Sequence, residues 1–181
     1  MHVERVGLVT QEHASRHFYW LDLFKWFKKG CIVRVSNYLD VDLIQFLEVS
    51  TRDEALSALV EALNQAGKLR DKNTFFRAIL EREKIVSTGI GMGVAIPHAK
   101  LKGFSNFFIA IGIQKNNGLE WNALDKAPVR VIFMIGGPDD RQTEYLQILS
   151  RLTSAIKDEE LRKKLLKAQS ADEVIKLFEP Y

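Results

Sequence analysis

The feature that most restricts the fold of this chain is a run of mostly apolar residues, "VRVIFMI", from Val129 to Ile135. A strand with one solvated face alternates apolar and polar residues, whereas this run is apolar at nearly every position. It therefore predicts a strand covered on both faces, with helices above and below a sheet. Gly136-Gly137-Pro138 is expected to end that strand. Gly93–Pro97 and Phe107–Ile113 are predicted to be strands as well.

Helical patterns alternate with these strands. Thr51 and Glu54 have the spacing of a capping box, which predicts a helix start, and Gly67 is expected to end that helix. The alternation predicts an α/β fold: a single domain over residues 31–181 with a mixed β-sheet flanked by helices. The other predicted elements are helices over Asn73–Arg82 and Gln142–Lys157, two shorter helices of which Ser170 and Glu173 open the second, and extended pieces at Ile32–Val35 and Leu43–Leu47.

Composition limits the class of protein. A chain of 181 residues with 46% hydrophobic residues can fill the core of one domain. The net charge is only +3 and the charges are spread, which argues against nucleic acid as a partner. One cysteine, Cys31, excludes a disulfide within the chain and a cysteine-based zinc site, so a reduced cytoplasmic protein is expected. No metal or other cofactor is expected.

The glycine-rich stretch "STGIGMGVAIPHAK", from Ser87 to Lys100, does not fit either common nucleotide-binding loop. A Walker A loop needs a glycine followed by Lys and Ser or Thr, and none occurs here. A dinucleotide fingerprint needs the spacing G-x-G-x-x-G before a helix, whereas Gly89, Gly91 and Gly93 are followed by strand-like residues. The glycines therefore indicate a tight turn or a close approach of another molecule to the backbone.

His98 ends this stretch, and two interpretations are open for it. A histidine at a strand end is often a satisfied core or surface residue. Pro97, however, ends regular strand pairing and fixes φ, which directs the next side chain out of the sheet. An accessible imidazole that is largely neutral at pH 7 is a nucleophile. Metal binding is not expected, because no further ligand lies at a suitable spacing.

The longer stretch "EKIVSTGIGMGVAIPHAK" resembles the active-site signature of the fructose/mannitol-type (type 2) enzyme IIA proteins of the bacterial phosphoenolpyruvate phosphotransferase system. The matching residues are Glu83, Ile90-Gly91 and the segment from Val94 to Ala99. The resemblance extends from about Ser36 to the C-terminus. The segment "STGIG" is most similar to the sequences of the nitrogen-related branch, whose members are regulators.

The resemblance implies that His98 accepts a phosphoryl group on Nε2, while its other ring nitrogen donates to a fixed backbone carbonyl. Arg82 matches the arginine of the family's "RE" motif and is expected to stabilise the phosphate, although a solvated cation at a helix end is the alternative. Gly89, Gly91 and Gly93 are expected to shape the site with backbone N–H groups. Many relatives carry a second histidine where this chain has Tyr145, whose hydroxyl can bind a phosphate oxygen or whose ring can simply pack in the core.

The resemblance also implies partners. The donor is expected to be HPr, a small phosphocarrier protein, or a paralogue of it. The acceptor is expected to be a regulated target protein or a separate IIB component, since the chain shows no IIB segment. Two other functions stay open: the IIA subunit of a fructose/mannitol-type sugar transporter, and a regulatory binding module that has lost phosphoryl transfer.

Residues 1–30 form an aromatic and basic extension outside this resemblance, and they are predicted to be helical. On a helix over residues 17–29, Trp20, Leu23, Phe24 and Phe27 share one face. Such a segment can pack on its own domain, make a weak contact with an anionic membrane or a partner protein, or reflect an over-extended reading frame.

Overall fold

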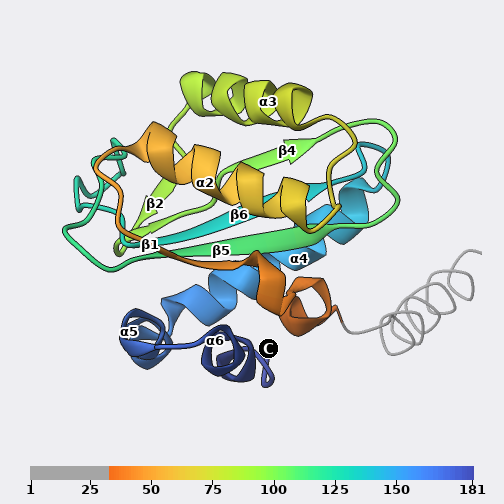
Figure 1. The fold of residues 1–181 in the computed structure, drawn as a ribbon. Coiled ribbons are helices and arrows are strands. Elements are labelled where there is room, and N and C mark those ends of the chain that lie inside the picture. The colour runs from red at the N-terminus through yellow and green to blue at the C-terminus, as the bar shows by residue number, and fades with distance from the viewer. Residues whose placement is uncertain (1–32) are drawn as a thin grey trace, which may run out of the picture. The chain divides into compact units, whose positions relative to one another are not determined.

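The computed structural model describes residues 33–181, and the predicted N-terminal helix lies outside these residues. A mixed six-stranded sheet runs through the described part in the order β1-β5-β6-β3-β2, and β4 also pairs with β6 (Figure 1). The β1–β5 and β3–β6 pairs are parallel, and the β5–β6 and β2–β3 pairs are antiparallel. The strands are β1 (Ile44–Leu47), β2 (Gly89–Gly91), β3 (Val94–Ala95), β4 (His98–Lys100), β5 (Phe108–Gln114) and β6 (Val131–Gly137).

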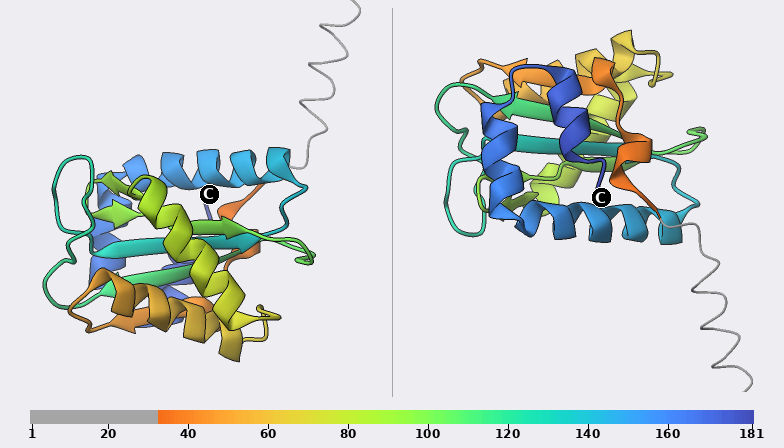
Figure 2. Two further views of the ribbon diagram at one scale, coloured as in Figure 1. Left: turned by 90° about the horizontal axis from the view of Figure 1, so that it is seen from above. Right: turned by 90° about the horizontal axis from the view of Figure 1, so that it is seen from below.

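Helices cover both faces of this sheet, which confirms the predicted α/β fold (Figures 1 and 2). On one face, α2 (Arg52–Gln65) packs on β5 and α3 (Lys72–Ile85) packs on β4. On the other face lie α4 (Gln142–Lys157), α5 (Glu159–Lys167) and α6 (Ala171–Leu177). Each face has its own apolar cluster, with Phe75 and Ile79 in one and Tyr145 and Ile148 in the other.

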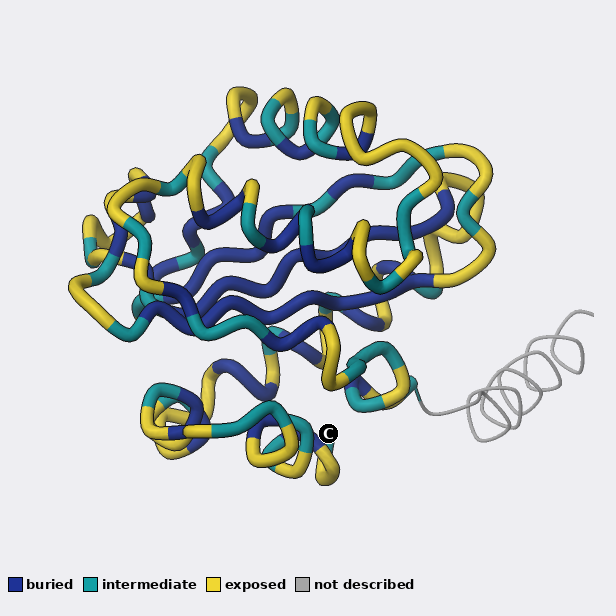
Figure 3. Tube along the Cα trace, viewed as in Figure 1, coloured by how far each residue is buried: buried dark blue, intermediate teal, exposed yellow. Residues whose placement is uncertain are grey.

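The two central strands are buried at every position, as the apolar run predicted (Figure 3). The bounds of β6 differ from the prediction, because this strand begins at Val131 rather than Val129 and continues through Gly136 and Gly137. A Cβ atom at Gly136 would lie 2.3 Å from Cζ of Phe108, and one at Gly137 would lie 2.1 Å from Cδ1 of Phe107. The two glycines thus leave room for the rings of Phe108, in the neighbouring strand β5, and of Phe107, the residue before it.

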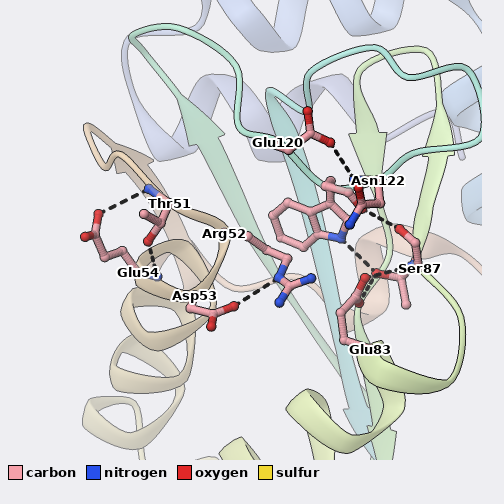
Figure 4. A network of polar contacts seen from close by, with 10 residues as sticks. Thr51, Arg52, Asp53, Glu54, Glu83, Ser87, Glu120 and Asn122 are labelled. Carbon is pink, nitrogen blue, oxygen red and sulfur yellow. Dashed lines mark hydrogen bonds and ion pairs between the residues drawn. The ribbon is translucent and has the colours of Figure 1, made fainter.

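Most helix limits follow the predicted signals. The capping box is present, since the Thr51 hydroxyl accepts from the Glu54 N–H and the Glu54 carboxylate accepts from the Thr51 N–H (Figure 4). The helix α4 has the predicted bounds. At α6 the Ser170 hydroxyl caps Glu173, but the Glu173 carboxylate accepts from the N–H of Gln169, one residue earlier than in a capping box.

Three local predictions were wrong. The helix α3 continues to Ile85, beyond Arg82, because the residues from Glu83 to Ile85 include no glycine or proline that would break it. Val35 begins a short 3₁₀ helix, η1 (Val35–Tyr38), where an extended piece was predicted. The predicted strand Gly93–Pro97 is interrupted: β3 ends at Ala95 and His98 begins β4. A second 3₁₀ turn, η2 (Val41–Leu43), precedes β1.

Among the described residues, no helix has both the length and the apolar character needed to cross a membrane.

Candidate functional site

The candidate site lies where one edge of the sheet is left open. Both β3 and β4 pair with β6, one after the other: Ala95 lies beside Ile132 and His98 beside Ile135. The strand β2 pairs with β3 but not with β4. Within residues 33–181 the outer edge of β4 is therefore free of a strand at His98, and side chains from the helices on both faces reach this histidine.

Two hydrogen bonds hold the imidazole of His98. Its Nδ1 lies 2.9 Å from the carbonyl oxygen of Ile96, and because a carbonyl only accepts, Nδ1 carries the proton. Its Nε2 accepts from Nε of Arg82 at 3.1 Å. A backbone carbonyl on one ring nitrogen was expected, and Ile96 supplies it. The ring is thus fixed in one tautomer with the Nε2 lone pair directed at the Arg82 guanidinium.

Burial is the main reason why the pKa of His98 lies below the ordinary value of 6.5. The positive charges of Arg82 and Lys100 lower this pKa further, while the hydrogen bond to Ile96 and the charge of Glu83 raise it. The imidazole is therefore neutral at pH 7, the state in which Nε2 is a nucleophile.

Arg82 projects from the last turn of α3 and makes a second bond besides the one to His98. Its Nη1 donates to the carbonyl oxygen of Val86 at 2.9 Å. This bond holds the guanidinium against the segment that follows the helix, so its plane stays oriented toward the imidazole. Nη2 makes no hydrogen bond within residues 33–181 and remains available to an anion.

Tyr145 reaches His98 from the opposite face of the sheet. The ring centroids lie 5.7 Å apart, and the Tyr145 side chain is 6% exposed, so it both packs in the core and borders the site. The ammonium group of Lys100 lies 4.7 Å from the centre of the Tyr145 ring and donates to Gln142. Burial raises the pKa of the Tyr145 hydroxyl, with the charge of Arg82 opposing that shift.

Sequence reasoning missed Lys100, although a signal was present. Residues two apart on a strand face the same side, so a lysine two positions after a reactive histidine on β4 lies beside it. This signal was hidden because the predicted strand ended at Pro97.

The glycines do not lie beside His98. Gly91 pairs with Val94, which pairs with Val131, whereas His98 pairs with Ile135. Four residues along β6 separate the two pairs, which is about 13 Å at about 3.3 Å per residue. Gly91 and Gly93 have φ of +90° and +73°, and a Cβ at Gly91 would lie 3.0 Å from a carboxylate oxygen of Asp125. These glycines form the turn between β2 and β3, and Gly89 pairs with Ala95.

A buried polar network fixes the end of α3. The carboxylate of Glu83, 5% exposed, accepts from the N–H of Thr88 at 2.9 Å and from its hydroxyl at 2.6 Å. The indole N–H of Trp121 donates to the same hydroxyl at 3.3 Å, and the Ser87 hydroxyl donates to the Trp121 carbonyl at 2.6 Å (Figure 4). The two neighbours Arg82 and Glu83 therefore hold the same turn, from Val86 to Thr88.

Together these groups suit a particular chemistry. A neutral imidazole with one proton fixed on Nδ1 can attack an electrophile with Nε2. The positive charges of Arg82 and Lys100 both act on this imidazole, and such charges stabilise an electrophile that carries negative charge. A phosphoryl group meets both requirements, since its oxygens are anionic and its phosphorus accepts a nitrogen nucleophile.

Comparison with known proteins agrees with this chemistry. The family model "Phosphoenolpyruvate-dependent sugar phosphotransferase system, EIIA 2" matches residues 37–180. The fructose-specific EIIABC component of Bacillus subtilis is 39% identical over 132 residues, which are 73% of this chain and only 21% of that protein. The nitrogen regulatory protein of Klebsiella oxytoca is 35% identical over 148 residues, 81% of this chain and 90% of that protein.

A solved structure shows the same architecture. The nitrogen regulatory protein IIA-Ntr of Neisseria meningitidis superposes with a TM-score of 0.74 at 28% sequence identity, over 80% of this chain and 98% of that one. The family match covers most of the chain, including every residue of the site described above. The chain therefore belongs to the EIIA type 2 family of the phosphoenolpyruvate-dependent phosphotransferase system.

Proposed function

We propose that this protein carries a phosphoryl group on Nε2 of His98. The observation that supports it most directly is the pair of hydrogen bonds on the imidazole, with Nδ1 on the Ile96 carbonyl and Nε2 on Arg82. The first bond keeps the proton off the attacking nitrogen. The second places a guanidinium where the phosphoryl oxygens arrive, so the same residue serves the free and the phosphorylated states.

The transfer is an exchange between two imidazoles. The Nε2 lone pair of His98 forms a bond to phosphorus while the bond from phosphorus to the donor's histidine nitrogen breaks, and the electron pair of that bond returns to the donor ring. Nε of Arg82 then donates to a phosphoryl oxygen in place of Nε2. Nδ1 of His98 keeps its proton throughout, and its bond to Ile96 stabilises the charge that the phosphorylated ring acquires.

We propose an HPr-like phosphocarrier as donor and a cytoplasmic location for the exchange. The relatives carry two kinds of name, fructose-specific and nitrogen regulatory, so the acceptor is either a IIB component or a regulated protein. The sequence "STGIG" before β3 favours the nitrogen-related, regulatory role. An acceptor assay with a fructose-type IIB protein separates the two, since a regulator transfers no label to it.

Reconstituted labelling tests the proposal. Phosphoenolpyruvate labelled with ³²P, the first enzyme of the system and HPr or its paralogue are expected to label the wild type through an acid-labile, base-stable bond. The His98→Ala variant should stay unlabelled while keeping the wild-type circular dichroism spectrum. An unlabelled wild type with every carrier tested would overturn phosphoryl transfer and leave the binding-module interpretation.

A further inference from the structure

A cavity of about 380 Å³ lies beside Lys100, at the end of β4 opposite to His98. One wall comes from the start of α3 and the residue before its cap, with Arg70, Asp71 and Thr74. The other wall is the segment that follows β4, from Leu101 to Phe104. Figure 1 shows the end of β4 and the start of α3 on the same side of the domain. The volume falls within the range of small-molecule sites, about 300–1,000 Å³.

The floor of this cavity is apolar and rigid. Phe104 is half-buried, and its ring makes edge-to-face contacts with Phe75 at 5.9 Å and with Phe108 at 5.6 Å between centroids. Leu101 is half-buried beside it. A ring held by two such contacts keeps its place when a ligand arrives, so it offers a preformed apolar surface.

Two cations, Arg70 and Lys102, line the rim of this cavity. Neither Arg70 nor Lys102 makes a hydrogen bond or ion pair with any residue from 33 to 181, although ion pairs are common elsewhere on this surface. Arg70 lies across the turn at Gly103, where φ is +89° and a Cβ atom would lie only 3.0 Å from Nη1. The absence of a side chain at this turn therefore leaves room for the guanidinium.

The acidic residues of the lining do not neutralise these cations. Asp71 is engaged as the cap of α3, where its carboxylate accepts from the N–H groups of Asn73 and Thr74 and from the Thr74 hydroxyl. Asp139 is exposed on the opposite rim and makes no bond to either cation within the described chain. Lys100 adds a third positive charge to the lining.

We propose that this cavity binds a small molecule with one anionic group, a phosphate or a carboxylate, on an apolar or aromatic body. The body packs on Phe104 and Leu101, and the anionic group bonds to Arg70 and Lys102. The site is distinct from that of His98, because Arg82, His98 and Tyr145 do not line this cavity. Lys100 lines the cavity and also contacts Tyr145. The proposal does not depend on phosphorylation of His98.

Titration with phenyl phosphate and with benzoate, followed by ¹H–¹⁵N NMR on the full-length unphosphorylated protein without carriers, tests this proposal. Saturable shifts are expected at the amides of Gly103, Phe104 and Thr74 with at least one of these probes, and the two probes distinguish phosphate from carboxylate. Inorganic phosphate, which lacks the apolar body, and phenol, which lacks the charge, should bind at least about tenfold more weakly.

The Arg70→Gln/Lys102→Gln double variant should weaken binding of the probe at least about tenfold, since each loses a charge-assisted hydrogen bond. The control Lys157→Gln/Lys176→Gln removes the same charge from exposed positions on other helices and should bind like the wild type. Shifts confined to the amides around Arg82 and His98 would overturn the proposal. So would the absence of saturable shifts with both probes at concentrations up to about 10 mM. So would equal weakening by the control.

Discussion

At the scale of single residues, the site depends on which nitrogen of each side chain is engaged. Arg82 uses Nε for the imidazole of His98 and Nη1 for the Val86 carbonyl. A lysine has one nitrogen at the end of a flexible chain and cannot keep both bonds in this geometry. Arg82 is therefore held in the site by the planar shape of its guanidinium group as well as by its charge.

The first prediction is that Arg82→Lys keeps the fold but slows phosphorylation of His98 by about 10²–10³, the cost of losing a positioned donor to developing charge. Single-turnover labelling measures it. Arg77→Lys is the matched control, because Arg77 lies on the same helix and donates to the Thr74 hydroxyl, at 3.2 Å, away from the imidazole. A wild-type rate in Arg82→Lys would remove Arg82 from the proposed site.

The second prediction concerns pH. Because burial and two cations lower the pKa of His98, the rate of phosphorylation should rise with pH through a midpoint below 6.5 and then stay level. Lys100→Met removes one of those charges and should move the midpoint upward. A midpoint at or above pH 6.5 in the wild type would contradict a lowered pKa of His98.

The same group contributes to stability with a defined sign. Its folded-state pKa lies below the unfolded value, so the unfolded chain binds more protons as the pH falls below 6.5. The free energy of unfolding should therefore decrease over that range and level off below the folded-state pKa. Urea unfolding at several pH values should show a smaller decrease in His98→Ala.

At the scale of elements, the end of α3 is held by side chains rather than by a helix cap. Among the described residues no capping bond is present at Val86, and the turn that follows is fixed by Glu83 and Thr88. The "RE" pair thus has two separate tasks: Arg82 reaches the site, and Glu83 secures the turn whose carbonyl orients Arg82.

The third prediction is that Thr88→Val weakens both the fold and phosphoryl transfer. It leaves a carboxylate oxygen of Glu83 and the indole N–H of Trp121 unpaired in the core, which costs about 1–3 kcal/mol of unfolding free energy. Loosening of the turn should also reduce the transfer rate measured well below the unfolding transition. Thr153→Val, at a half-buried hydroxyl that bonds within α4, is the control and should leave the rate unchanged. Equal rates in the two variants would show that Glu83 has only a structural role.

At the scale of the whole molecule, residues 33–181 contain both apolar clusters and every residue of the candidate site. The aromatic segment 17–29 lies outside the described residues, and its role stays a prediction. The described part has what a folded domain requires: a central sheet whose strands β5 and β6 are covered on both faces.

The fourth prediction is that deletion of residues 1–30 leaves folding and labelling of His98 intact and abolishes any binding to anionic liposomes. Lysines 25, 28 and 29 and the aromatic face favour weak, salt-sensitive binding to such a surface. Thermal unfolding, labelling and liposome sedimentation at two salt concentrations measure these effects. A truncated chain that fails to fold would place the aromatic segment in the core of the domain.

Much of this protein follows from sequence alone, because the signals are local. Continuous apolar residues identify β5 and β6, the Thr51–Glu54 pair identifies the start of α2, and apolar spacing identifies α4. The motif around His98 identifies the family. The expectation that Pro97 ends regular strand pairing before this histidine was wrong, because pairing is interrupted only at Ile96 and Pro97 and resumes at His98, which lies beside Ile135.

Only the tertiary structure decided how the site is assembled, because its parts meet across the edge of a sheet. The strand β2 pairs with β3 and does not reach β4, so the edge of the sheet at His98 stays open. The register of β3 and β4 on β6 determines where this open edge begins. The same register separates the glycines from His98, although they lie within ten residues of it in the chain. Lys100 joins the site because β4 begins at His98, and Tyr145 joins it from the opposite layer. Neighbourhood in sequence predicts contact within one turn or strand, whereas strand pairing and the layers of the sheet determine contact between elements.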